Sequence, residues 1–213
     1  MSPEHLETDP RFWVLSEALA SYAADSDDPP PPDPDSLQAA VSLIIRASDP
    51  LDMLLIKRAR SERDPWSGHM ALPGGRRDPA DPDLMATVVR ETREEVGIDL
   101  ATAGAHLGRL GDVDTSSVRL PKLTISPFVF GTPARTGARV ASPEVDAVHW
   151  VTLEQLRAPG THGTVEIPLP GGRRAFPCYR VAGEVVWGLT YRILAEFLEV
   201  FSDAELRRRA MEG

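Results

Sequence analysis

Three glutamates, Glu91, Glu94 and Glu95, lie within one predicted helical turn in the segment RETREEVGI. At spacings of i, i+3 and i+4 their carboxylates are neighbours, and like charges at these spacings destabilise a helix. One interpretation is a solvated face on which Arg90 and Arg93 neutralise part of the charge. The other is a bound divalent cation, because several hard carboxylate oxygens on one turn suit Mg²⁺ or Mn²⁺.

The helix that carries these glutamates has recognisable ends. Asp81 can serve as N-cap, Pro82 suits the first helical position, and Gly97 suits a left-handed C-cap, so we expect a helix from about residue 82 to 96. At about 100° per residue its buried face is predicted to comprise Leu84, Met85, Val88, Val89, Thr92 and Val96. The glutamates border this face, which favours the cation over the solvated face.

A glycine-rich turn, LPGG, comes just before the helix. Gly74 and Gly75 carry no side chain, so their backbone could supply a further metal ligand or leave space for one. The hexapeptide LPGGRR occurs at residues 72–77 and again at 169–174. The second copy has no acidic helix after it and is interpreted as a hairpin turn, with Gly171 and Gly172 at positive φ.

Three segments are predicted along the chain. Residues 1–36 hold an amphipathic helix (12–22) and an acidic, proline-rich linker (24–35). Residues 37–201 form the main domain, and 202–213 form a polar helical tail. Within the domain we expect a short helix capped by Thr152, a hairpin around PLPGGRRAF, a final helix from 187 to 201, and strands at 39–45, 52–58, 105–113, 123–131 and 145–151.

Composition excludes several classes of protein. A formal net charge of −9 argues against nucleic-acid and anionic-membrane partners, since both require a basic face. No apolar run is long enough to span a bilayer, and the N-terminus is acidic, so we expect a cytoplasmic protein. The single cysteine, Cys178, excludes an internal disulfide and is predicted to be buried in a strand.

The segment GGRRDPADPDLMATVVRETREEVGI resembles the Nudix box, GX5EX7REUXEEXGU, in which U is a bulky aliphatic residue. Its second half matches as Arg90, Glu91, Glu94, Glu95, Gly97 and Ile98. The spacing from Gly75 to Arg90 is one residue longer than the pattern, and an aspartate, Asp81 or Asp83, replaces the first glutamate. Thr92 replaces an aliphatic residue.

Within the Nudix superfamily, the chain is most similar to the coenzyme A pyrophosphatase-like group. The similarity lies in the stretches LLXXR (Leu54, Leu55, Arg58), PFVF at 127–130, EVXXXXWV at 144–151 and WGLT at 187–190. The resemblance implies an α/β class fold, an α/β/α sandwich with a mixed β-sheet. It also implies hydrolysis of a nucleoside diphosphate linked to another group, with coenzyme A or a derivative as the candidate substrate.

The resemblance also implies roles for individual residues. Glu91 and Glu95 would be the main ligands of Mg²⁺ or Mn²⁺, with Gly75 as a backbone ligand and Glu94 as a further ligand or the general base; the sequence leaves these two roles of Glu94 open. Arg90 would orient the glutamates. The candidate substrate-binding residues are Arg58, Arg63, Arg76, Arg77 and Gly74, with Glu144 as an alternative base and Trp66 and His69 as possible contacts to a nucleobase.

Several alternatives remain open at this point. The substrate could be another nucleotide, such as ADP-ribose, a dinucleotide or a nucleoside triphosphate. A non-catalytic ligand sensor of the same fold would be expected to lack a box glutamate, and an isomerase would require an acidic motif beside Cys178, which is absent. Because many proteins of this fold pair up, the N-terminal helix could dock on a second subunit in a homodimer.

Overall fold

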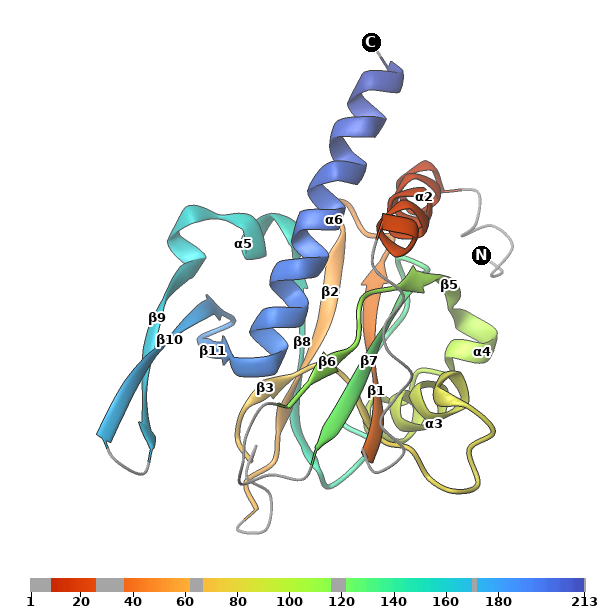
Figure 1. Cartoon of the computed structure of the whole chain (residues 1–213). Coiled ribbons are helices and arrows are strands. Elements are labelled where there is room, and N and C mark those ends of the chain that lie inside the picture. The colour runs from red at the N-terminus through yellow and green to blue at the C-terminus, as the bar shows by residue number, and fades with distance from the viewer. Residues whose placement is uncertain (1–8, 26–36, 62–66, 116–121, 170–171, 213) are drawn as a thin grey trace.

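The structure is a computed structural model, and it describes residues 9–25, 37–61, 67–115, 122–169 and 172–212. Arg63, Trp66 and Gly171, three residues singled out from the sequence, lie outside the described residues. A mixed β-sheet lies between two helical layers (Figure 1). This arrangement is the α/β/α sandwich expected from the sequence.

The main sheet is built around one long parallel pair. β1 (Leu37–Arg46) pairs in parallel with β7 (Leu123–Thr132) along its whole length. The other pairings are antiparallel. The remaining strands of this sheet are β2 (Asp52–Arg58), β3 (Met70–Ala71), β4 (Gly74–Arg76), β5 (Ala105–Arg109), β6 (Val113–Asp114) and β8 (Val145–Thr152). The predicted strand at 105–113 is thus two short strands, β5 and β6.

Each face of this sheet has its own hydrophobic core. Because side chains alternate along a strand, Leu43 and Ile45 of β1 face one core while Ala40 and Ile44 face the other. The first core contains α2 (Pro10–Asp25) and α6 (Gly188–Glu212), and the second contains α3 (Leu84–Val96) and α4 (Leu100–Ala103). The glutamates therefore lie on the face opposite to α2 and α6.

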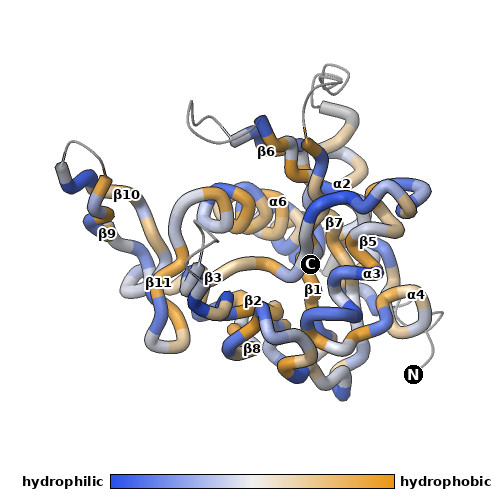
Figure 2. The backbone as a smooth tube through the Cα atoms, turned by 90° about the horizontal axis from the view of Figure 1, so that it is seen from below, coloured by the Kyte–Doolittle hydropathy of each residue, from blue (hydrophilic) through white to orange (hydrophobic). Residues whose placement is uncertain are grey.

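A second, three-stranded sheet extends from the body of the molecule. It contains β9 (His162–Leu169), β10 (Gly172–Val181) and β11 (Glu184–Trp187), all antiparallel. The outer part of the β9–β10 hairpin projects sideways beyond α6 (Figure 2). Gly172 has φ +128°, as expected for the second LPGGRR copy, and Cys178 is buried in β10 as predicted.

Before this hairpin, the short helix α5 (Leu153–Arg157) and a 3-10 turn (Pro159–Thr161) follow β8. Thr152 caps α5 as predicted: its hydroxyl accepts the Gln155 N–H at 3.1 Å, and the Gln155 side chain accepts the Thr152 N–H at 3.2 Å.

The N-terminal helix packs more closely than the sequence suggested. The sequence separates this helix from the domain and leaves it available to a second subunit, whereas Phe12, Leu15 and Leu19 are buried in the first core of the same chain. A Cβ built at Gly131 would lie 2.7 Å from the Phe12 ring, and one built at Gly108 would lie 2.9 Å from Leu19. The missing side chains of two glycines thus make room for α2.

The final helix is also longer than expected. α6 continues without a break through the predicted tail at 202–213 as far as Glu212, and Ala204 is buried in the first core. Among the helices that the structure describes, none combines the length and the apolar character needed to cross a membrane.

Candidate metal and diphosphate site

The first LPGGRR copy places the backbone of Gly74 against the acidic helix. Gly74 belongs to β4, which pairs with β1, and its N–H donates to Glu95 Oε2 at 2.9 Å. It has φ +149°, and a Cβ there would lie 2.2 Å from the Ala40 carbonyl oxygen. Only glycine can occupy this position.

Gly75 makes room for the second carboxylate. A Cβ built on Gly75 would lie 2.5 Å from Cδ and Oε1 of Glu91. The Glu91 carboxylate therefore occupies the space in which any other residue would have its side chain. The absence of a side chain at Gly75 therefore lets the Glu91 carboxylate lie against the turn.

Thr92 has a polar partner that explains its departure from the aliphatic pattern. Its hydroxyl lies 2.9 Å from that of Ser42 in β1, and both residues are fully buried. The Ser42 N–H in turn donates to the Pro73 carbonyl at 2.8 Å. The helix, the central strand and the LPGG turn are thus tied together by one hydrogen-bonded group.

The two aspartates that could replace the first glutamate of the box have different contacts in the structure. Asp83 is the N-cap of α3 and accepts the Ala86 N–H at 2.8 Å, so the predicted cap, Asp81, was wrong and the helix begins at Leu84. Asp81 is buried, and it accepts hydrogen bonds from Arg90, Thr87 and the Asp78 N–H. With its carboxylate bound in this way, it cannot cap the helix.

Arg90 joins Asp81 to the glutamates. Its guanidinium donates to both Asp81 oxygens at 3.1 and 2.8 Å, to Glu91 at 2.9 Å and to Glu94 at 3.3 Å. It also donates to the Arg76 carbonyl. The hydrogen bond from Arg90 holds the pKa of Asp81 far below its usual range. This geometry supports the orienting role expected for Arg90.

The glutamates differ in their environments. Glu95 is 4% exposed, and burial raises its pKa to about 7, with the Gly74 N–H acting in the opposite direction. Burial also raises the pKa of Glu91, whereas the Glu94 side chain is 58% exposed. Two adjacent carboxylates that resist ionisation are therefore placed where a cation would stabilise their charged forms.

The donor set fits a hard divalent ion bound partly by substrate. Among the described residues, no group of three or more His, Cys, Asp or Glu side chains is arranged to enclose a metal. Mg²⁺ is usually held by one or two carboxylates with waters and phosphate oxygens completing the shell. Glu91 and Glu95, beside the space at Gly75, can provide such a pair.

The other predicted site residues fall into two groups. Arg58 lowers the pKa of Glu95, and Glu144 raises the pKa of both Glu91 and Glu95, so these two charges lie near the carboxylates. Arg77 instead donates to the Asp81 and Pro82 carbonyls and to Gln38, so its guanidinium is held within the loop before α3. Arg76 is exposed beside the Gly75 turn.

An aromatic pair that the sequence did not indicate lies beside Arg58. The Arg58 N–H donates to the His69 carbonyl, and the His69 ring lies 5.0 Å from the Trp187 ring. The sequence places Trp187 at the start of the last helix, but in the structure it ends β11 and is half-buried. The contact joins residues far apart in sequence, so spacing gave no signal for it.

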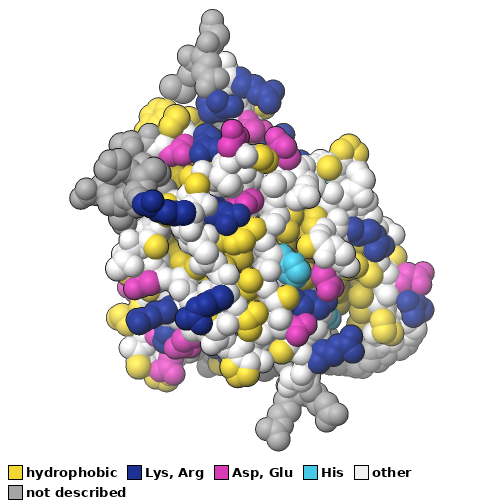
Figure 3. Space-filling model, turned by 180° about the vertical axis from the view of Figure 1, so that it is seen from behind, with side chains coloured by type: hydrophobic (Ala, Val, Ile, Leu, Met, Phe, Trp, Pro, Cys, Tyr) yellow, Lys and Arg dark blue, Asp and Glu magenta, His cyan; other side chains and the backbone are white. Residues whose placement is uncertain are grey.

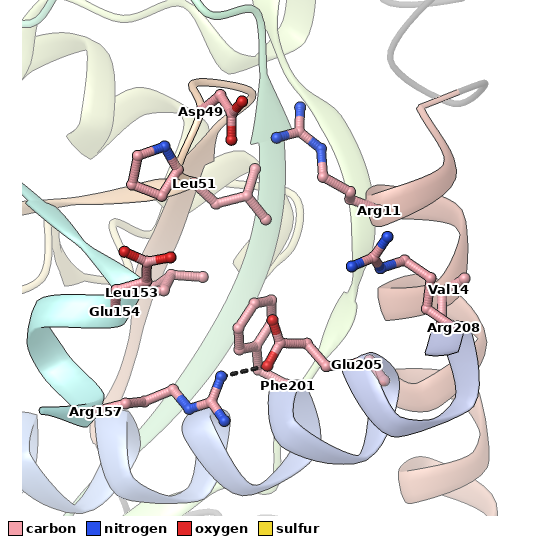
Figure 4. Close-up of a pocket in the computed structure, with 12 residues that line it drawn as sticks. Arg11, Val14, Asp49, Leu51, Leu153, Glu154, Arg157, Phe201, Glu205 and Arg208 are labelled. Atoms are coloured by element: carbon pink, nitrogen blue, oxygen red, sulfur yellow. Dashed lines mark hydrogen bonds and ion pairs between the residues drawn. The ribbon is translucent and has the colours of Figure 1, made fainter. Parts of the chain in front are cut away.

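A cavity of about 190 Å³ lies away from the carboxylates, between α2, α5, α6 and the β1–β2 turn (Figure 4). Leu51, Leu153 and Phe201 provide apolar walls, while Arg157 pairs with Glu205 at the rim. Arg11 is bound to Asp9 and to the Ser48 carbonyl. These guanidinium groups already have partners within the chain.

Comparisons with known proteins agree with this geometry. A model of the NUDIX domain matches residues 36–168. The chain is 40% identical over 118 residues to an uncharacterized protein of Schizosaccharomyces pombe, covering 54% of this chain but only 36% of that relative's length. It is 28% identical over 174 residues to an uncharacterized Nudix hydrolase NudL of Photorhabdus laumondii, covering 80% of this chain and 90% of that protein.

Solved structures show the same fold. A MutT protein from Methanosarcina mazei aligns with a TM-score of 0.50 at 21% identity, covering 81% of this chain and 95% of that one. A MutT/nudix family protein from Enterococcus faecalis aligns with a TM-score of 0.52 at 18% identity, covering 92% and 74%. With its box residues on α3 and a family match over more than half its length, the chain belongs to the Nudix family of hydrolases.

Proposed function

We propose that this protein is a divalent-metal-dependent pyrophosphohydrolase that cleaves a nucleoside diphosphate linked to another group, with coenzyme A or a derivative as the leading substrate. The observation that carries the proposal is the buried Glu95 carboxylate, held by the Gly74 N–H beside the half-buried Glu91. The preference for coenzyme A rests on the sequence motifs around Arg58 and Trp187.

Glu91 and Glu95 would hold the metal ion. When bound, Mg²⁺ or Mn²⁺ neutralises the diphosphate and lowers the pKa of the attacking water. The protein itself fixes the two carboxylates: Gly74 binds one, Gly75 makes room for the other, and Arg90 orients Glu91 from the side. Arg58, and the exposed Arg76, could bind phosphate oxygens.

Glu94 and Glu144 are the two candidates for the general base. Glu94 is largely exposed and bound only at 3.3 Å by Arg90, so its carboxylate can turn toward a water. Glu144 is exposed just before β8, and its charge raises the pKa of both Glu91 and Glu95 in addition to the larger effect of burial. Glu94→Gln and Glu144→Gln should be compared: loss of the base lowers kcat while the concentration of Mg²⁺ for half-maximal activity stays constant, whereas loss of a ligand raises that concentration.

The central test is turnover of a diphosphate panel. Coenzyme A, ADP-ribose, diadenosine polyphosphates and dNTPs are incubated with Mg²⁺ or Mn²⁺, and the phosphate-containing products are separated. Glu95→Gln should lower kcat/KM by about 10³-fold or more, because a metal ligand is lost. Glu17→Gln, on the exposed side of α2, is the matched control and should act like the unmodified protein.

Two outcomes would contradict the proposal. If Glu95→Gln remained active, the metal would be bound elsewhere. If the unmodified protein turned over no member of the panel while binding one of them tightly, a ligand sensor would be the better description.

A further inference from the structure

The outer sheet carries an apolar strip on the same side as the catalytic carboxylates. Arg58 and His69 face each other across β2 and β3, and paired residues of antiparallel strands point to the same face. On β2, Leu54 and Ile56 face the second core, which contains α3, and Arg58 follows at the same alternate spacing. The charge of Arg58 also lowers the pKa of Glu95, against the larger effect of burial. His69 therefore also points to the catalytic face.

From His69, aromatic contacts lead through Trp187 into the β9–β10 hairpin. The Trp187 ring lies 5.0 Å from His69 and 5.4 Å from Phe176. Phe176 pairs with Val165, and Ile167 follows two residues later on the same face of β9. We define the hairpin strip as Trp187, Phe176, Val165 and Ile167.

The strip is half-buried along its length, whereas residues on the opposite face of the outer sheet are buried in the first core. Tyr179, Val181 and Val186 point to that other face and are buried in the first core with Ile193 and Leu194 of α6. The residues of the strip are all intermediate in exposure. α6 packs on the face of the outer sheet that carries Tyr179, Val181 and Val186, and α3 packs on the main sheet.

We propose that the hairpin strip binds the non-phosphate group of the substrate and favours an extended, apolar group over a compact sugar. This rests on the proposed function, since the strip begins beside Arg58, where the diphosphate would lie. From Trp187, which pairs with Cys178, the strip runs four residues along β10 to the level of Ile167, which pairs with Arg174. At about 3.3 Å per residue the strip is about 13 Å long. A compact sugar would contact only the inner end of the strip, at Trp187 beside His69.

In the part of the chain that the structure describes, the surface on this side of the molecule has no concentration of charge of one sign that would select between an extended, apolar group and a compact sugar (Figure 3). In Figure 3, which shows the side hidden in Figure 1, acidic and basic side chains of the described residues are interspersed, with hydrophobic side chains exposed between them. Arg174, which pairs with Ile167, lies on the same face at the outer end of the strip, whereas Phe176, Val165 and Trp187 between it and His69 are uncharged. Apolar contact is therefore the main recognition that this surface offers.

The test uses one variant on the strip and one on the other face of the same hairpin. Ile167→Ser removes apolar surface from the strip, whereas Ala175→Ser changes an exposed residue that points the opposite way. With octanoyl-coenzyme A, Ile167→Ser should raise KM about fivefold to tenfold while kcat stays within about twofold, because only binding of the apolar group is weakened. With ADP-ribose both parameters should change less than about twofold.

A probe without a diphosphate separates the strip from the catalytic site. S-octanoylpantetheine should bind the unmodified protein and Glu95→Gln equally in calorimetry, and Ile167→Ser should weaken its Kd about fivefold. If this binding is seen but no diphosphate is turned over, the strip stands and the proposed hydrolase activity fails. Absence of binding to the unmodified protein, or equal effects of Ile167→Ser and Ala175→Ser, would overturn the inference.

Discussion

The two copies of LPGGRR show how little a short motif determines by itself. In the first copy, Gly74 has its Cβ direction blocked at 2.2 Å by the Ala40 carbonyl and binds Glu95, and Gly75 faces Glu91. In the second copy, Gly172 has nothing within 4 Å of a built Cβ, and Leu169 is 38% exposed. The same hexapeptide contacts the α3 carboxylates in one place and lies between β9 and β10 in the other, because only the first copy faces α3.

The strongest way to test this difference is to add a methyl group to each copy. Gly75→Ala would place a Cβ 2.5 Å from the Glu91 carboxylate and displace it, so kcat/KM should fall about 10²-fold. Gly172→Ala should leave kcat/KM within about twofold, because that residue is remote from the carboxylates. It should still lower the free energy of unfolding by about 1 kcal/mol, since alanine is strained at φ +128°.

Kinetics and chemical denaturation of both variants measure these effects. Similar losses of activity in the two variants would mean that the first copy has no special relation to the glutamates. Circular dichroism spectra that match those of the unmodified protein would confirm that Gly75→Ala acts on the site rather than on the fold.

The two LPGGRR copies also differ in their contact with Arg90, which donates to the Arg76 carbonyl of the first copy. Asp81→Asn removes the charged partner that fixes Arg90, so the orientation of Glu91 should loosen and kcat/KM should fall about tenfold. The free energy of unfolding should decrease by about 1–3 kcal/mol, because a charged hydrogen-bonded pair is broken.

Asp83→Asn is the matched control, two residues away. Asparagine caps a helix about as well as aspartate, so activity and stability should both be retained. An Asp83→Asn protein as impaired as Asp81→Asn would indicate that the helix start, rather than the link to Arg90, matters for catalysis.

The third and smallest difference concerns pH. Glu95 beside the first copy has its pKa raised to about 7, whereas Glu166 beside the second is two-thirds exposed and paired with Arg173. A raised folded-state pKa contributes stability that is complete below the unfolded value of 4.5 and is lost as the pH rises through about 7. Without divalent metal, Tm should therefore decrease between pH 5 and pH 8.

Thermal unfolding of two variants isolates this contribution. Glu95→Gln should raise Tm by about 2–4 °C at pH 8 and by almost nothing at pH 5, a shift that corresponds to roughly 1 kcal/mol. Glu166→Gln should keep the pH dependence of the unmodified protein. Added Mg²⁺ should raise Tm at pH 8 in the unmodified protein but not in Glu95→Gln; an equal rise in both would place the ion away from Glu95.

Local signals in the sequence were sufficient for much of the fold. Gly97 ends α3 with φ +72° as predicted, and Val88, Thr92 and Val96 are buried as the helical spacing indicated. The long strands also lie where alternating and continuous apolar runs placed them. These features depend on residues within a few positions of each other, where backbone preferences and periodicity dominate.

Features that depend on distant partners could not be predicted. The sequence predicts Asp81 as the cap of α3, but Arg90, nine residues after Asp81, binds the Asp81 carboxylate, and Asp83 caps the helix. Trp187 has helical spacing to the residues after it, but it faces His69 across two sheets. The burial of α2 depends on glycines about ninety and more residues away, which no local pattern connects with Phe12.

The position of α2 matters for anyone who shortens this protein. A version starting at residue 36, where the family match begins, would lack Phe12 and Leu19. The surfaces of Gly131 and Gly108, which these two side chains cover, would then be exposed. It would also take away Tyr22, the hydroxyl partner of Glu196 in α6. Trimming to the recognised boundaries would thus remove part of the hydrophobic interior.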